Sequence, residues 1–235
     1  MAKPKPSPIH DLVEIRRRLL TAVAADDLLL DLLVLKGGNA LELIHRIGER
    51  ASLDLDFSME ADVTDARELG GNVESMRRRS IELTGSHQRI FKIDISKYEY
   101  CRGHMTANVD QYELHVYTPA MIAAEKLRAV CQQMPEYAQR RNPAPRPRDF
   151  YDIHAVVMRA GVRLQDEREL VRQMFAAKDV PWVFLALIGR DRDRDFHRQG
   201  WAAVVESVRG ELRDFDYYFD FVAAEASNLH ALGEA

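Results

Sequence analysis

Two aspartates stand one residue apart in the short alternating stretch LDLDF at positions 53–57. Successive side chains of an extended strand point to opposite faces, so Asp54 and Asp56 share one face and the apolar residues share the other. Residues two apart on one face lie about 6–7 Å from each other. That spacing lets both carboxylates bind one divalent cation or a close metal pair. The alternative is a sheet with one face in water.

A second stretch, at positions 89–98, alternates in the same way. Phe91, Ile93 and Ile95 fall on one face, and Asp94 falls on the other with its polar neighbours. If the two strands are neighbours, Asp94 becomes a third carboxylate beside Asp54 and Asp56; this assignment rests on the alternation. Three converging carboxylates repel one another and need a cation, and hard oxygen ligands favour Mg²⁺. Two such ions are a recurring arrangement for nucleotidyl transfer.

A glycine pair, Gly37 and Gly38, follows an apolar stretch and precedes a helix-like one. Backbone N–H groups at a helix N-terminus are available to phosphate oxygens, and glycine allows close approach of the backbone. The alternative is an ordinary tight turn from strand to helix. The succession of strand, glycine pair, helix, strand and paired aspartates is more specific than either motif alone.

A lysine in the second half of the chain, Lys126, lies on the margin of an apolar helical stripe. The stripe consists of Ala123, Leu127, Val130 and Met134. This position predicts an ammonium aimed along the seam between the two halves of the chain. The alternative is a lysine that buries its stem and keeps its charge in water.

Two further aspartates, Asp149 and Asp152, are three residues apart in a helix-like stretch and line up with Ile153 and Val156. Carboxylates on a core-facing stripe require partners. Lys126 or Arg148 would serve, unless Asp149 instead caps the helix.

The elements that must position these residues differ between the two halves. Helices are expected at residues 10–25 (with Asp11 as N-cap), 39–49 and within 60–85, and strands at 52–58, 89–98 and 112–118. Residues 27–38 are expected to run from a short helix into a buried strand that ends at the glycine pair. Helices alone are expected at 119–134, 149–161, 166–177, 181–190, 197–210 and 216–227. We therefore predict an α/β domain at 1–118 and a helical domain at 119–235.

These motifs together resemble a known family. The matching residues are Lys36-Gly37-Gly38, Ala40-Leu41, Arg50-x-Ser52-x-Asp54-x-Asp56-Phe57, Glu125-Lys126-Leu127 and Arg146-x-Arg148-Asp149-x-Tyr151-Asp152. The pattern is similar to that of the AbiEii/AbiGii-type toxin nucleotidyltransferases, within the superfamily that includes DNA polymerase β. The resemblance spans about residues 34 to 157.

The resemblance implies an α+β fold: a polymerase-β-like sheet domain with flanking helices, then an all-helical C-terminal domain that completes the active-site cleft. It implies catalytic roles for Asp54, Asp56, Lys126 and Asp149, the last as acid or base. It implies a nucleotide site formed by Lys36, Gly37, Gly38, Arg50, Ser52, Lys126 and Asp152. The expected Mg²⁺ ligands, for one or two ions, are Asp54, Asp56 and Asp94.

The function implied is Mg²⁺-dependent transfer of a nucleoside monophosphate from an NTP to an acceptor hydroxyl. By resemblance the acceptor is RNA, at the 3′ end of tRNA, and the protein is the toxin of a type IV toxin–antitoxin or phage-defence pair with a cognate antitoxin. Arginines at 140, 141, 146 and 148, with Tyr137, form either an RNA-binding patch or a solvated loop.

Two alternatives stay open: a nucleotidyltransferase that modifies a small molecule such as an antibiotic, and a catalytically silent nucleotide-sensing module. The intact glycine pair and paired aspartates argue against the silent module. A net charge of −4 over 235 residues gives no global basic field and fits the small acceptor slightly better than RNA.

Composition limits the remaining classes of protein. Apolar residues make up 46% and charged residues 30%, which is typical of a globular chain. The longest apolar runs are too short to span a bilayer. Cys101 and Cys131 show no metal-binding spacing. We expect a cytoplasmic protein without a membrane segment.

Overall fold

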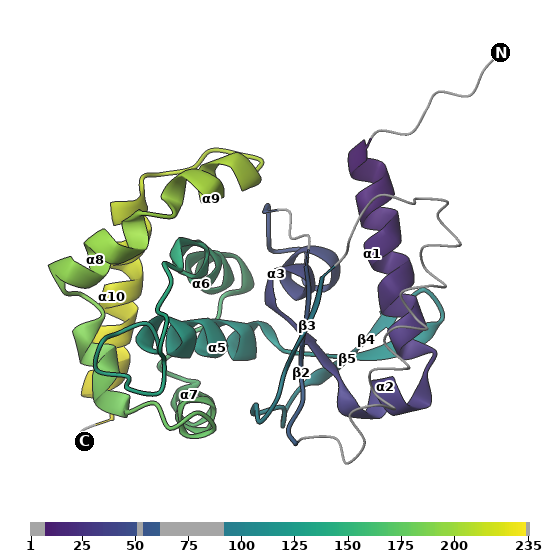
Figure 1. The fold of residues 1–235 in the computed structure, drawn as a ribbon, viewed down its shortest axis with the longest axis horizontal. Coiled ribbons are helices and arrows are strands. Elements are labelled where there is room, and N and C mark those ends of the chain that lie inside the picture. The colour runs from purple at the N-terminus through teal and green to yellow at the C-terminus, as the bar shows by residue number, and fades with distance from the viewer. Residues whose placement is uncertain (1–7, 51–53, 62–91, 234–235) are drawn as a thin grey trace. The chain divides into compact units, whose positions relative to one another are not determined.

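The computed structural model describes residues 8–50, 54–61 and 92–233 of the chain. These residues form two compact units (Figure 1). The first unit combines residues 1–39 and 53–116, and the second combines residues 40–52 and 117–235. The domain boundary near residue 118 stays a prediction.

The first unit contains a mixed five-stranded sheet. Its strands are β1 (Val34–Lys36), β2 (Leu55–Ser58), β3 (Ile93–Ser96), β4 (Met105–Val109) and β5 (Tyr112–Val116). Their order across the sheet is β3-β2-β1-β5-β4. Strand β1 is antiparallel to β2 and parallel to β5, β2 is parallel to β3, and β4 and β5 form an antiparallel pair.

The register of the central strands separates an apolar face from a polar one. Leu35 pairs with Phe57, which pairs with Ile95, and the first two are fully buried. One residue further along β1, Lys36 pairs with Asp56, which pairs with Asp94. Directly paired residues have their side chains on the same face. The alternation predicted for both aspartate-bearing strands is therefore present in the sheet.

The described part of the first unit also contains the helical segments α1 (Pro8–Ala24), α2 (Asp27–Leu32) and the short α3 (Gly37–Asn39). Helix α1 packs against β5 and β4 and buries Leu19, Leu20 and Val23, which recur at helical spacing. Asp26 caps α2, because its side chain accepts a hydrogen bond from the Leu29 N–H at 3.1 Å.

The regular elements among the described residues of the second unit are helices. They are the π-helix η1 (Ala40–Ile44), α5 (Pro119–Cys131), α6 (Pro147–Ala160), α7 (Arg168–Ala176), the 3₁₀ helix η2 (Trp182–Leu187), α8 (Asp191–Arg198), α9 (Trp201–Ser207) and α10 (Phe215–Ala231). Helix α5 packs against α6 and α7, and α10 packs against η2 and α6.

The segment after α3 is tied to the second unit by α6. Arg159 donates to the carbonyl of Ile47 at 3.0 Å and pairs with Glu49 at 3.1 Å. Arg50 forms a β-bridge with Val208. These contacts explain why residues 40–50 group with the later helices although they follow β1 and α3 in sequence.

Several sequence predictions are corrected in detail. Helix α1 begins at Pro8, so Asp11 is inside it and is not the N-cap. The helix predicted at 39–49 begins earlier, at Gly37 in α3, and its helical backbone ends with η1 at Ile44. Strand β4 was not predicted: its five residues are largely exposed, although Met105, Ala107 and Val109 alternate with polar residues. The helix predicted within 60–85 lies outside the described residues, apart from its first two positions.

Within the described ranges, no helix has both the length and the apolar character needed to cross a bilayer.

The turn after β1 leads to a testable prediction about adding a side chain at Gly37. This residue has φ +70°, and a Cβ there would lie 2.6 Å from Asp56 Oδ2. Gly103 has φ +82° with open space around it, so it serves as a control for backbone strain alone. We expect Gly103→Ala to lower the free energy of unfolding by about 1–2 kcal/mol and Gly37→Ala to lower it by clearly more. Urea denaturation measures both, and equal losses would contradict the close approach.

Candidate active site

The carboxylates predicted at positions 56 and 94 lie on one face of the sheet, and the one at position 54 directly precedes that part of the sheet. Asp56 and Asp94 are direct partners on β2 and β3, and Asp54 precedes β2 by one residue. Asp54 is exposed, Asp56 is half-buried and the Asp94 side chain is 44% exposed. From the sequence, Asp94 becomes a third carboxylate only if the two strands are neighbours. Strands β2 and β3 are neighbours in the sheet. We call Asp54, Asp56 and Asp94 the carboxylate row.

A lysine at the start of β3 supplies positive charge to this row. Lys92 Nζ donates to Asp94 Oδ2 at 2.7 Å. That hydrogen bond and the charge of Asp94, followed by the charges of Asp54 and Asp56, raise the pKa of Lys92. All three carboxylates thus act on one ammonium group, as expected for carboxylates that lie close together.

The glycine turn meets the carboxylate row directly. Gly37 lies against the Asp56 carboxylate, and no larger residue fits there without displacing it. Next to it, the fully buried Asn39 donates its side-chain amide to the backbone carbonyl of Asp54. Asn39 Oδ1 accepts a 2.9 Å hydrogen bond from Arg16, a buried residue of α1. The turn, β2 and α1 are therefore joined by polar contacts immediately beside the row.

Lys36, predicted to bind nucleotide, is 7% exposed and lies on the same face as the carboxylate row. Its ammonium donates to Ser96 Oγ at 3.1 Å and lies 4.0 Å from Glu99 Oε1. It is therefore held in the sheet. Gly38 is buried in α3 beside Gly37. Ser52 lies outside the described residues.

The donor set of the row is suited to a hard cation, but it is not a closed cage. Among the residues that the structure describes, no group of three or more His, Cys, Asp or Glu side chains is arranged to hold a metal ion. Mg²⁺ is usually bound by one or two carboxylates together with substrate phosphates and water. Oxygen ligands on an accessible face fit that mode of binding, in which the nucleotide supplies the remaining ligands.

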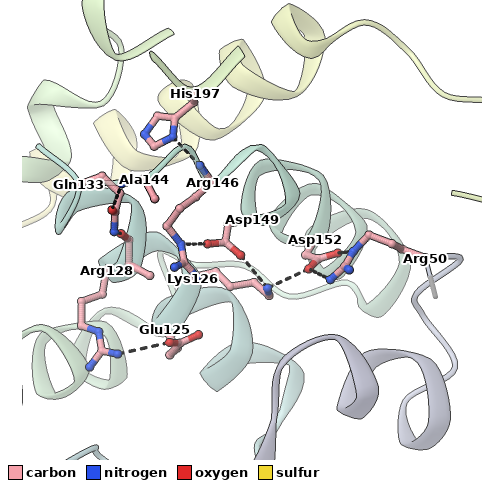
Figure 2. Close-up of polar contacts among 11 residues, drawn as sticks. Arg50, Glu125, Lys126, Arg128, Gln133, Ala144, Arg146, Asp149, Asp152 and His197 are labelled. Carbon is pink, nitrogen blue, oxygen red and sulfur yellow. Dashed lines mark hydrogen bonds and ion pairs between the residues drawn. The ribbon is translucent and has the colours of Figure 1, made fainter. Parts of the chain in front are cut away.

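A second set of predicted residues meets inside the helical unit (Figure 2). Lys126 Nζ lies 2.8 Å from Asp149 Oδ1 and 2.8 Å from Asp152 Oδ2. Asp152 also pairs with Arg50 at 3.1 Å, and Asp149 also pairs with Arg146. We call this chain of Arg146, Asp149, Lys126, Asp152 and Arg50 the ion-pair chain.

Burial makes these pairs strongly coupled. Burial by itself lowers the pKa of Lys126, but the charges of Asp149 and Asp152 outweigh it and the pKa lies above its ordinary value. Burial raises the pKa of Asp149, while Arg146 and Lys126 lower it by more. Asp152 has a lowered pKa for the same reason, with Arg50 and Lys126 as the cations. All three groups are therefore charged near neutral pH.

Two alternatives from the sequence are decided by this geometry. Lys126 is 5% exposed, so it does not keep its charge in water. Helix α6 begins at Pro147, with Arg146 at the N-cap position, so Asp149 lies in the first turn and is not the cap. Of the two partners suggested for the aspartates, Lys126 is the one found, because Arg148 is exposed.

Three positioning residues escaped the sequence analysis. Arg16 lies three and four residues before Leu19 and Leu20, and a cation on that buried stripe signals a buried partner. Asn39 follows the glycine pair and gave no such signal. His197 Nδ1 accepts a 3.0 Å hydrogen bond from the backbone N–H of Arg146. The pKa of this imidazole is lowered to about 4, mainly because the ring is buried. His197 is therefore neutral near pH 7 and orients the start of α6.

Comparison with known proteins decides the family. The model of the nucleotidyl transferase AbiEii toxin family, of type IV toxin–antitoxin systems, matches residues 18–96 and 60–224. The chain belongs to this family. It is accordingly a nucleotidyltransferase, and the two matched stretches contain every residue of the carboxylate row and of the ion-pair chain.

Solved structures support the fold of this AbiEii family member. JHP933 from Helicobacter pylori has 15% sequence identity and a TM-score of 0.55, with 97% of this chain and 94% of that chain covered. An H. pylori protein described as a candidate nucleotidyltransferase also has 15% identity and a TM-score of 0.55, with 96% of each chain covered. No curated protein matches this sequence. The predicted α+β nucleotidyltransferase fold is confirmed.

The ion-pair chain predicts a large difference between two lysines. Lys126→Ala leaves Asp149 and Asp152 buried without their shared cation, so the free energy of unfolding should fall by about 3–5 kcal/mol. Lys92→Ala removes an exposed ion pair and should change stability little. Urea denaturation at pH 7 measures both. Similar stability of the two variants would contradict a structural role for the buried pairs.

Proposed function

We propose that this protein is a Mg²⁺-dependent nucleotidyltransferase toxin that moves a nucleoside monophosphate from an NTP to an acceptor hydroxyl of RNA, at the 3′ end of tRNA. The observation that carries the proposal is the carboxylate row beside the glycine turn. The pKa of Lys92, raised by all three carboxylates, supports the view that the row favours a cation.

In this proposal Asp54 and Asp56 hold Mg²⁺, and Asp94 lies beside Asp56 on the same face. The metal, when bound, neutralises charge on the triphosphate and orients it for in-line attack. Gly37 and Gly38 allow the nucleotide to approach the backbone. Asn39 donates to the backbone carbonyl of Asp54, and Arg16 donates to Asn39 and so holds this amide in position.

We assign the residues of the ion-pair chain to the phosphates and to positioning. Lys126 is the proposed phosphate contact, and Arg50 and Asp152 hold it in place. Asp149 is buried between two cations and has a lowered pKa, so in this state it is a weak base. Asp94 is more exposed, which favours it over Asp149 as the group that accepts the proton of the attacking hydroxyl.

The family description supports the biological setting. A type IV toxin–antitoxin family implies an antitoxin as the partner, and a toxin that transfers nucleotides needs a cellular acceptor. Exposed arginines at 140, 141 and 148 supply local positive charge that the acidic chain lacks overall. Local cations of this kind suit an RNA backbone.

The direct test is a transfer assay. Purified protein is incubated with Mg²⁺, each α-labelled NTP in turn and total tRNA, and labelled RNA is measured. We expect wild type to label tRNA with one preferred NTP and Asp56→Asn to lose at least about 100-fold in rate. Asp31→Asn changes an exposed carboxylate of α2 outside the row and should retain activity.

The other outcomes separate the alternatives. Binding of NTP with Mg²⁺ but no labelling of RNA would reject the RNA acceptor and favour a small molecule. Equal activity of wild type and Asp56→Asn would reject the carboxylate row as the active site.

A further inference from the structure

A pocket of about 380 Å³ lies at the start of α6, within the helical unit. Its lining residues come from the loop before α6, from the first turn of α6 and from the region of α9. They are Pro145, Arg146, Pro147, Arg148, Asp149, Gly200 and Ala203. Its volume is at the small end of the range for small-molecule sites. The volume of the pocket therefore fits a single nucleotide unit better than it fits a peptide or a folded domain.

The pocket is positively charged where it is open. The Arg146 side chain is 32% exposed, and Arg148 is exposed without an ion pair among the described residues. Asp149, the carboxylate in the lining, is buried and engaged by Lys126 and Arg146. The lining thus holds one guanidinium group without an ion pair among the described residues, Arg148, and a second, Arg146, that is partly exposed while paired with Asp149. The fork geometry of both groups suits phosphate oxygens.

A third arginine, Arg140, is not part of the lining but lies near enough to Arg146 to be affected by its charge. Burial, and then the positive charge of Arg146, lower the pKa of Arg140, so the two guanidinium groups are near enough to repel each other. Repulsion between like charges costs stability in the free protein. It is relieved when an anion binds, so a cluster of cations is a physical indication of an anion site.

The uncharged walls fit the rest of a nucleotide unit. Pro145 and Pro147 give apolar surface beside the arginines, and Gly200 lies so close to Pro147 that an added Cβ would be 3.0 Å from its Cγ. Helix α6 has 14 residues, and its N-cap residue makes no side-chain capping hydrogen bond. Its positive end adds to the field of the arginines.

We propose that this pocket binds a backbone phosphate of the acceptor RNA, with Arg146 and Arg148 as the phosphate contacts and the prolines against the adjoining ribose. The assignment rests on the proposed function, since it concerns the acceptor of that reaction. It adds a binding site for the acceptor backbone that is separate in role from the carboxylate row. Free nucleotide or inorganic phosphate is the other source of the same chemistry, and the test distinguishes these sources.

The test places a negative charge in the pocket. Ala203 is exposed on α9 and lines the pocket, whereas its neighbour Ala202 is exposed on the same helix and does not. Filter binding of labelled tRNA to the full chain, without NTP, is measured for Ala203→Glu and Ala202→Glu over a range of salt concentrations. We expect Ala203→Glu to weaken tRNA binding by about 10-fold and to reduce the salt slope by about 1, and Ala202→Glu to leave both near wild type.

A second pair of variants removes a cation instead. Arg148→Ala should weaken tRNA binding and raise the KM for tRNA, with the KM for NTP unchanged. Arg163→Ala removes an exposed arginine of the same unit whose partner, Asp166, is also exposed, and should leave both KM values unchanged. Circular dichroism and thermal melting confirm that each variant is folded.

Three results would overturn the proposal. Equal tRNA binding by Ala203→Glu and Ala202→Glu would remove the pocket as an RNA site. A raised KM for NTP in Arg148→Ala, with unchanged tRNA binding, would assign the pocket to the nucleotide. Displacement of tRNA by inorganic phosphate to the same extent from wild type and Ala203→Glu would place the phosphate site elsewhere.

The failure of the pocket assignment is distinguishable from that of the proposed function. If wild type labels tRNA and the variants match their controls, the pocket assignment alone fails. If wild type neither binds nor labels tRNA, the RNA acceptor fails and the pocket assignment fails with it.

Discussion

Carboxylates that a fold brings together must be compensated by cations, and this electrostatic constraint shapes both units of the molecule. In the sheet unit, Asp54, Asp56 and Asp94 all act on Lys92. In the helical unit, Asp149 and Asp152 share the ammonium of Lys126. Removing one partner from such a buried pair leaves an uncompensated charge, which is far more costly than the loss of an exposed pair.

The same constraint gives the two groups different chemical uses. The ion-pair chain is buried, its members stay charged near neutral pH, and each carboxylate has two cations. Such a group is rigid and holds a cation in a fixed place. The carboxylate row is accessible, and its cation is an exposed lysine, Lys92. The carboxylate row is therefore suited to a cation that exchanges. The ion-pair chain is suited to cations that stay in place.

Much of the sheet site follows from the sequence because β-alternation is a local property. Period two in residues 53–57 and 89–98 is enough to put the aspartates on one face of each strand. The pairing of β2 with β3 is different, since more than thirty residues separate Asp56 from Asp94 and parallel strands carry no local signal of their partner. The contact between Gly37 and Asp56 likewise depends on tertiary structure.

The helical unit shows the same division. The spacing of Asp149 and Asp152 indicated a need for a cation, and Lys126 was a correct choice, but only the packing of α5 against α6 selects it over Arg148. Arg16 was missed because its partner, Asn39, is 23 residues away in the sequence. Asn39 was missed because its partner is a backbone carbonyl, that of Asp54. The β4 strand was missed although its apolar and polar residues alternate, because it is short and largely exposed at the edge of the sheet.

Under the proposed function, the carboxylate row binds nucleotide together with Mg²⁺. The most direct measurement is calorimetric titration of a non-hydrolysable NTP analogue into wild type and Asp56→Asn, each with and without Mg²⁺. We expect the NTP analogue to bind tightly only to wild type in the presence of Mg²⁺. Its binding should be weak to wild type without Mg²⁺ and to Asp56→Asn with or without Mg²⁺. Binding to Asp56→Asn that is as tight and as dependent on Mg²⁺ as in wild type would contradict this expectation.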